Sequence, residues 1–172
     1  MLHSYSYNFG IPMTLLRFFT VYGPWGRPDM ALFKFVDAML KDKPIEVYNN
    51  GEMWRDFTYI DDLIRSIEKL INIIPNNKKM FKNDSLSADA PYRIVNVGNQ
   101  NPIYLKDFIN TIEKTLGLKS QKVNLPMQKG DVTYTHSDTS LLQNLINFKP
   151  DTKIEYGVKK FCEWYKKYYL NM

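Results

Sequence analysis

The chain has 172 residues, of which 44% are hydrophobic and 15% aromatic, enough apolar material for one globular domain or a domain plus part of another. No apolar run reaches about 18 residues and no basic-then-apolar leader follows Met1, so we expect a cytoplasmic protein without a membrane segment. The single cysteine, Cys162, excludes an intrachain disulfide and a thiolate metal cluster. The net charge of +5 comes largely from lysines in scattered pairs, which does not indicate a nucleic-acid partner.

In the first third of the chain, apolar spacing alternates between strand-like and helix-like periods. The short apolar run at 14–19 predicts a strand. Asp29 is expected to cap the N-terminus of a helix over 32–41, where apolar residues recur at helical spacing. Two further strands are predicted at 45–48 and 57–60.

The rest of the chain repeats this alternation. A helix over 61–74 carries one apolar stripe, and the polar, lysine-rich segment 76–91 predicts an exposed loop. A buried type of strand is expected at 93–97, followed by a helix over 105–116 that Gly117 stops. The remaining expected elements are an extended piece at 123–126, a short helix at 139–146 and a final helix through 158–168. Strands alternating with helices indicate α/β packing, with some strands added to a parallel sheet.

Four side chains suggest binding of a nucleoside diphosphate. The planar guanidinium groups of Arg55 and Arg27 match the paired oxygens of a diphosphate, although an ordinary arginine paired with an aspartate explains Arg55 equally well. Tyr48 offers a ring for a nucleobase, but it also fits a tyrosine that covers the core from an edge strand. Asp131 follows Gly130 and is a candidate for the ribose hydroxyls, or simply part of a turn.

Five phrases in order carry a resemblance that covers almost the whole chain. They are RFFTVYGPWGRPDMALFKF, VYNNGEMWRDFTYIDDL, YRIVNVGN, MQKGDV and EWYKKYY. In this order and spacing the chain resembles the extended short-chain dehydrogenase/reductase family, and within it the UDP-glucuronate 4-epimerases.

The resemblance implies a role for particular residues. Thr20 would face the sugar, and a threonine at this position favours a uronic acid whose carboxylate accepts from the hydroxyl. Arg27 and Arg55 match positions that hold the carboxylate or the diphosphate. The resemblance also implies that Met30 and Ala31 contact uracil through their backbone and that Tyr48 is its aromatic neighbour. It implies that Gln128 and Asp131 form a phosphate-and-ribose pair. Phe18 and Phe19 match positions beside the nicotinamide.

The chain departs from the family pattern where the cofactor and the catalysis are concerned. Gly23 and Gly26 begin the Gly-x-x-Gly-x-x-Gly spacing that binds NAD, but the third position is Asp29. The catalytic Tyr-x-x-x-Lys is expected before Met1, and Tyr156 with Lys160 repeats its spacing only at the start of the final helix, where we expect a structural role. We therefore assign no catalytic residue, and His3 and His136 give no metal site because no acidic or sulfur ligands cluster with them.

We expect residues 1–172 to be a partial NAD-dependent epimerase/dehydratase. It would comprise the C-terminal UDP-sugar-binding domain and the last strands of an NAD-binding Rossmann fold, with the N-terminal cofactor half absent. The family reaction implied is the interconversion of UDP-glucuronate and UDP-galacturonate with NAD, and we expect this chain alone to be inactive and not to bind NAD. The expected ligand is a UDP-sugar. Three alternatives stay open: half of a split enzyme completed by a separate N-terminal NAD-binding chain, a non-catalytic UDP-sugar-binding module, and a truncated product without function.

Overall fold

The computed structural model describes residues 1–76 and 78–171. One end of the molecule is built on a parallel strand pair, β1 (Met13–Phe18) with β5 (Tyr92–Val97), in which Met13 lies opposite Tyr92. Helices α3 (Ile60–Ile71) and α5 (Ser140–Ile146) pack on this pair through a cluster of buried residues. This smaller of two hydrophobic clusters consists of Leu63, Leu70, Val95, Val97, Leu142, Leu145 and Ile146. Helix α1 (Leu2–Phe9) contacts both strands but buries only Ser6.

The middle of the molecule is a small mixed sheet. Strand β2 (Thr20–Tyr22) lies parallel to β4 (Trp54–Tyr59), and β6 (Pro102–Tyr104) pairs with the other edge of β4 in the antiparallel direction. β2 follows β1 after one residue, Phe19, so the strand predicted at 14–19 corresponds to β1, and β2, which belongs to another sheet, was not predicted.

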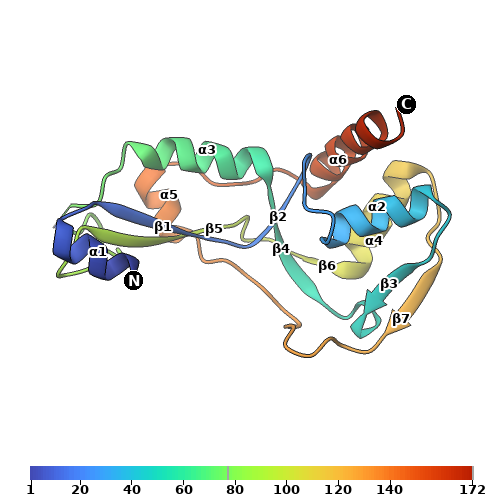
Figure 1. The fold of residues 1–172 in the computed structure, drawn as a ribbon, viewed down its shortest axis with the longest axis horizontal. Helices are drawn as coiled ribbons and strands as arrows, with labels where there is room; N and C mark the ends of the chain where they lie inside the picture. The colour runs from blue at the N-terminus through green and yellow to red at the C-terminus, as the bar shows by residue number, and fades with distance from the viewer. Residues whose placement is uncertain (77, 172) are drawn as a thin grey trace.

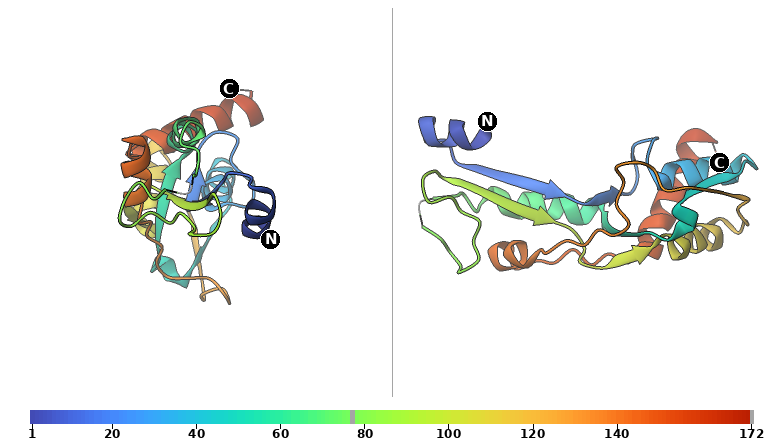
Figure 2. Two further views of the ribbon diagram at one scale, coloured as in Figure 1. Left: turned by 90° about the vertical axis from the view of Figure 1, so that its left-hand side faces the viewer. Right: turned by 90° about the horizontal axis from the view of Figure 1, so that it is seen from below.

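The opposite end holds the larger core. Three helices, α2 (Ala31–Leu40), α4 (Leu105–Leu116) and α6 (Ile154–Tyr169), pack together with a parallel pair, β3 (Ile45–Tyr48) and β7 (Lys122–Leu125). A single 3-10 turn, η1 (Asn49–Gly51), leads from β3 to β4. The larger hydrophobic cluster, at this end, includes Val36, Val47, Phe57, Phe108, Ile112, Val158, Phe161 and Cys162. Figures 1 and 2 show an elongated molecule with the two chain ends at opposite ends of its long axis.

The α/β architecture expected from the sequence is confirmed, and most elements lie within a few residues of their predicted places. α4 ends at Gly117, whose φ of 70° is left-handed, as the glycine predicted. Two expectations are corrected. α2 begins at Ala31 with Met30 at the N-cap, because the Asp29 carboxylate is engaged by Arg27 and makes no cap bond. α3 ends at Ile71, three residues before the predicted end.

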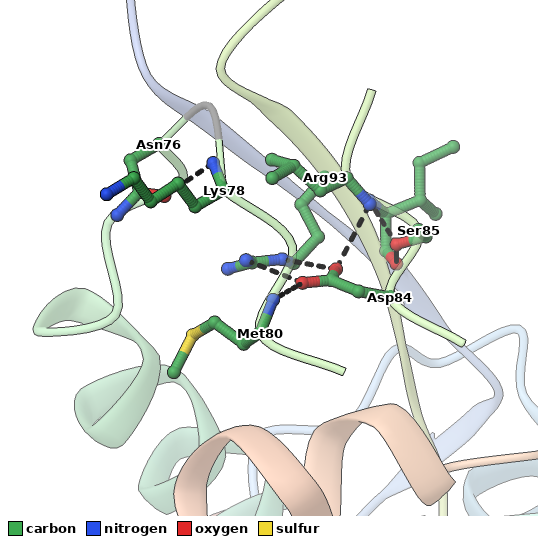
Figure 3. A network of polar contacts seen from close by, with 8 residues as sticks. Asn76, Lys78, Met80, Asp84, Ser85 and Arg93 are labelled. Atoms are coloured by element: carbon green, nitrogen blue, oxygen red, sulfur yellow. Dashed lines mark hydrogen bonds and ion pairs between the residues drawn. The ribbon is translucent and has the colours of Figure 1, made fainter. Parts of the chain in front are cut away.

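The segment predicted as an exposed loop, 76–91, contains no helix or strand in its described residues, but it is not uniformly exposed. Asp84, Leu86 and Ala90 are buried. The Asp84 carboxylate accepts from the Arg93 guanidinium at 2.8 and 3.0 Å and from the backbone N–H of Met80 and Leu86 (Figure 3). A buried ion pair therefore ties this segment to β5, and the expectation of full exposure is corrected at these positions.

None of the helices in the described part of the chain is both long and apolar enough to cross a membrane.

Candidate functional site

A pocket of about 490 Å³ lies in the larger end of the molecule, within the size range of sites for small organic ligands. Its walls come from β2, the first turns of α2, β3, β4 and the segment that connects β7 to α5, residues 126–139, which we call the β7–α5 connection. Figure 1 shows these elements gathered around β4. Seven of the eight substrate-binding residues predicted from the sequence line this pocket: Thr20, Met30, Ala31, Tyr48, Arg55, Gln128 and Asp131.

The central sheet places Thr20 and Arg55 on the pocket. Thr20 on β2 lies opposite Phe57 on β4, and Arg55 precedes Phe57 by two residues. Since side chains alternate between the two faces of a strand, Arg55 and Phe57 share a face while Asp56 points to the other side. Thr20, Arg55 and Phe57 all line the pocket, whereas the Asp56 side chain is completely buried behind it.

The first turn of α2 brings backbone N–H groups to the pocket. Met30 has extended backbone angles at the N-cap, and Ala31 is the first helical residue. The first N–H groups of a helix have no partner within the helix, so they are available to a ligand with acceptor oxygens. The Met30 N–H already donates to the Arg27 carbonyl at 3.1 Å, so Ala31 is the predicted residue whose backbone N–H this geometry offers to a ligand.

The β7–α5 connection supplies the other side of the pocket and is fixed to β4. The Trp54 N–H donates to the Thr133 carbonyl at 2.8 Å, and the Thr135 N–H donates to the Trp54 carbonyl at 3.2 Å. Between these anchors and β7, Gln128 and Asp131 lie on a turn in which Gly130 has a φ of 83°. This turn presents both residues to the pocket.

Arg55 and Asp131 meet inside the pocket. The Arg55 Nη2 atom donates to Asp131 Oδ1 at 2.8 Å, and Nη1 donates to the Trp54 carbonyl at 2.9 Å. The Arg55 side chain is only 17% exposed and that of Asp131 35%. Two residues that the sequence suggested separately are therefore one ion pair.

Tyr48 is held by its neighbour on β3. Its hydroxyl donates to Glu46 Oε2 at 3.1 Å, and this hydrogen bond, with the charge of Glu46, raises the pKa of Tyr48. The phenol therefore stays protonated at neutral pH and presents its ring to the pocket without charge.

Two sets of predicted residues lie elsewhere. Arg27 is not part of the pocket lining, because its exposed guanidinium is engaged by Asp29, with Nε at 3.0 Å from Oδ1. Phe18 and Phe19 lie at the end of β1 and also outside the pocket, with Phe18 47% exposed. The structure thus separates the three residues from the seven that it brings together.

Three charged lining residues were missed by sequence reasoning: Asp29, Lys34 and Glu46. For Lys34 and Glu46, the spacing to a predicted site residue could have indicated a place on the pocket. Lys34 follows Met30 by four residues on α2, and Glu46 precedes Tyr48 by two on β3, so each shares a face with a predicted residue.

The Tyr156–Lys160 pair sits in the first turns of α6, away from the pocket lining. The Lys160 Nζ atom lies 5.6 Å from the centre of the Tyr156 ring, which packs edge-on against Tyr59. Cys162, on the same helix, belongs to the larger core, and burial raises its pKa to about 12. These contacts are those of packing residues.

The sequence carries no complete glycine turn of the kind that binds a dinucleotide. None of the eight glycines completes the Gly-x-x-Gly-x-x-Gly spacing, and Phe18 and Phe19 lie at the end of β1, outside the pocket lining. We therefore assign no chemical step to NAD on this chain.

Comparison with known proteins identifies the family. Residues 1–98, more than half of the chain, match the model of the NAD dependent epimerase/dehydratase family. The chain belongs to this family. Its relatives include a probable UDP-glucuronate 4-epimerase of Rhizobium meliloti, 49% identical over 98% of this chain and 51% of the relative. UDP-glucuronate 4-epimerase 1 of Arabidopsis thaliana is 42% identical over 97% of this chain and 39% of the relative.

Solved structures of the family have the same fold. The UDP-glucuronic acid 4-epimerase of Bacillus cereus, in complex with UDP-glucuronic acid and NAD, matches with a TM-score of 0.82 and 32% identity over 97% of this chain and 49% of that one. The UDP-glucose 4-epimerase of Thermotoga maritima matches at 0.80 with 22% identity, over 96% of this chain and 50% of that one, which supports the fold alone. The resemblance to UDP-glucuronate 4-epimerases is confirmed, and the chain spans about half the length of the relatives it matches.

Proposed function

We propose that residues 1–172 form the nucleotide-sugar-binding part of a UDP-glucuronate 4-epimerase, which interconverts UDP-glucuronate and UDP-galacturonate. The observation that carries the proposal is the convergence of seven predicted residues, from five separate segments, on one pocket of about 490 Å³. The relatives' names and the UDP-glucuronic acid in a solved neighbour support the same substrate.

In this proposal each wall of the pocket holds one part of the ligand. Met30 and Ala31 bind uracil through the backbone at the start of α2, and Tyr48 covers its face. Arg55 binds the diphosphate, since it is the guanidinium that lines the pocket. Asp131 accepts from the ribose hydroxyls, with Gln128 beside it, and Thr20 donates to the carboxylate of the sugar.

The chemistry of epimerisation lies outside these 172 residues in our proposal. The chain provides no glycine turn for NAD, and its Tyr156–Lys160 pair is packed on α6 away from the pocket. The chain by itself therefore binds and orients the nucleotide sugar without converting it to product.

A split enzyme is the second candidate, because β1 is paired on one edge only. Among the described residues it pairs with β5 and with no second strand, and Phe18 at its end is about half exposed. A two-stranded parallel sheet is unusual, since parallel sheets are normally larger and covered on both faces. A separate NAD-binding chain that adds a strand at this edge would complete the sheet.

Calorimetry with the purified 172-residue chain tests the proposal. We expect UDP-glucuronate to bind, with affinity reduced at least about tenfold by Arg55→Ala because a charged hydrogen-bond donor to the diphosphate is lost. Arg65→Ala is the matched control, since Arg65 lies on α3 against the Phe148 ring and outside the pocket.

The same preparation, supplied with NAD, should give no epimerisation of UDP-glucuronate. Turnover by the chain alone would contradict the assignment of the chemistry to another part of the protein. Absence of any UDP-glucuronate binding would contradict the proposed function itself.

A further inference from the structure

The charges on the pocket walls do not favour an anion as a whole. Five charged side chains line the pocket, and three of them are carboxylates. They are Asp29, Glu46 and Asp131 against Lys34 and Arg55. A nucleoside diphosphate carries at least two negative charges, so specific contacts must offset its repulsion by the excess of carboxylates.

Each of the three carboxylates is engaged by a neighbour, and in only one case is that neighbour a cation that itself lines the pocket. Asp29 pairs with Arg27, which lies outside the lining, and Glu46 accepts from the neutral Tyr48 hydroxyl. Asp131, by contrast, accepts from Arg55 at 2.8 Å. The guanidinium proposed to bind the diphosphate is therefore already occupied by a carboxylate of the pocket.

The ion pair is held from both sides. Arg55 is fixed by its second hydrogen bond, to the Trp54 carbonyl, and Asp131 Oδ1 also accepts from the Val132 N–H at 2.8 Å. Because the Arg55 side chain is only 17% exposed, water screens the pair less than it screens a surface ion pair. An anion gains the Nη2 contact that Asp131 now holds only by displacing that carboxylate, and an anion bound to the other N–H donors of Arg55 lies close to its negative charge.

We propose that Asp131 is an internal counter-ion that makes the pocket selective for a nucleoside diphosphate over a free diphosphate. This rests on the proposed function. When a nucleotide binds, Arg55 exchanges the carboxylate for a phosphate oxygen, and the released carboxylate takes the ribose hydroxyls. A diphosphate without ribose meets the same carboxylate but offers it no hydroxyl in return.

The test compares pyrophosphate with UDP, by calorimetry on the full chain without divalent metal. Asp131→Asn removes the charge of the counter-ion, so we expect the affinity for pyrophosphate to rise about fivefold. The affinity for UDP should stay equal or fall, because the same substitution weakens the ribose contact. Asp131→Ala is measured in parallel, and circular dichroism verifies that both variants are folded.

Glu46→Gln is the matched control. It removes one carboxylate from the same pocket but releases no cation, so we expect less than about a twofold gain for pyrophosphate. The double variant with Arg55→Ala should lose the gain of Asp131→Asn, because the gain depends on the freed guanidinium.

The outcomes separate this inference from the proposed function. Unchanged pyrophosphate affinity in both Asp131 variants, or an equal gain in Glu46→Gln, overturns the counter-ion role even if UDP binds. Failure of the unsubstituted chain to bind UDP overturns the proposed function as well.

Discussion

The Ser137 hydroxyl donates to the Asp56 carboxylate at 2.5 Å, and the Ser137 N–H donates to the same oxygen at 2.8 Å. Asp56 also accepts from the backbone N–H groups of Asn99 and Gln100, at 3.0 and 3.2 Å. One completely buried carboxylate thus joins β4, the turn after β5 and the end of the β7–α5 connection. It stands directly behind Arg55, so it fixes the two segments that form the Arg55–Asp131 pair.

Replacing Asp56 should therefore destabilise the chain strongly. Asp56→Asn keeps the shape but loses the charge, and its amide donors face N–H groups, so we expect a loss of about 2–4 kcal/mol. Urea denaturation measured by circular dichroism gives the value. Ser137→Ala, which removes one hydroxyl and keeps the backbone contacts, should cost only about 1 kcal/mol. Equal stabilities of Asp56→Asn and the unsubstituted chain would show that this carboxylate is dispensable.

The Asp84–Arg93 pair should behave as a buried ion pair. The two side chains are 0% and 1% exposed, and the hydrogen bonds from Arg93, Met80 and Leu86 outweigh burial and lower the pKa of Asp84. Asp84→Ala leaves the guanidinium buried without its partner, so we expect about 3–5 kcal/mol of destabilisation. The same substitution at Asp29, whose pair with Arg27 is exposed and screened by water, should leave the stability nearly unchanged. Comparable losses in the two variants, measured in urea, would contradict the structural difference between the pairs.

Glu113 makes the stability of α4 depend on pH. Burial alone would raise the pKa of this carboxyl, but hydrogen bonds from Lys119, Ser120 and Lys122 outweigh burial and lower the pKa to about 2. Because the folded pKa lies below the ordinary value of 4.5, the contribution is complete above about pH 4.5 and is lost as the pH falls toward 2.

Glu113→Gln should accordingly lower the stability at pH 7 by about 1–2 kcal/mol and flatten its dependence on pH between 4.5 and 2. Chemical denaturation at a series of pH values measures both effects. Glu163→Gln is the control, since Glu163 is half exposed and its lysine partners lie at 3.5 and 3.9 Å. A slope that Glu113→Gln leaves unchanged would assign the pH dependence to other groups.

The sequence predicted those features of the fold that depend on residues close together in the chain. The apolar stripe of α3 and the glycine at the end of α4 act over a few residues, so the helices could be placed from the sequence. Asp29 shows where this fails: its carboxylate can cap a helix or pair with a cation, and Arg27 two residues earlier takes it. The segment 76–91 failed for a related reason, because its average composition hides the buried Asp84.

The candidate site was predicted residue by residue from the resemblance, but not as a geometry. Arg55 and Asp131 are separated by 76 residues, and no spacing in the sequence indicates that they touch. Lys34 and Glu46 were missed because each was assigned only to a helix or a strand, and the sequence does not indicate that these elements line a pocket. Arg27 was assigned to the ligand, and only the fold shows that its guanidinium pairs with Asp29 and does not itself line the pocket.

The two hydrophobic clusters give the chain two units that can open separately. Each is a small core of its own, and Ile60, at the start of α3, packs against both. Small cores are individually marginal, and cooperative units of this size can lose their structure independently. A single melting temperature describes this chain only if the contacts around Ile60 and β4 make both cores melt together. If the two clusters open separately, the pocket, which lies beside the larger cluster, keeps its shape while the β1–β5 end is open.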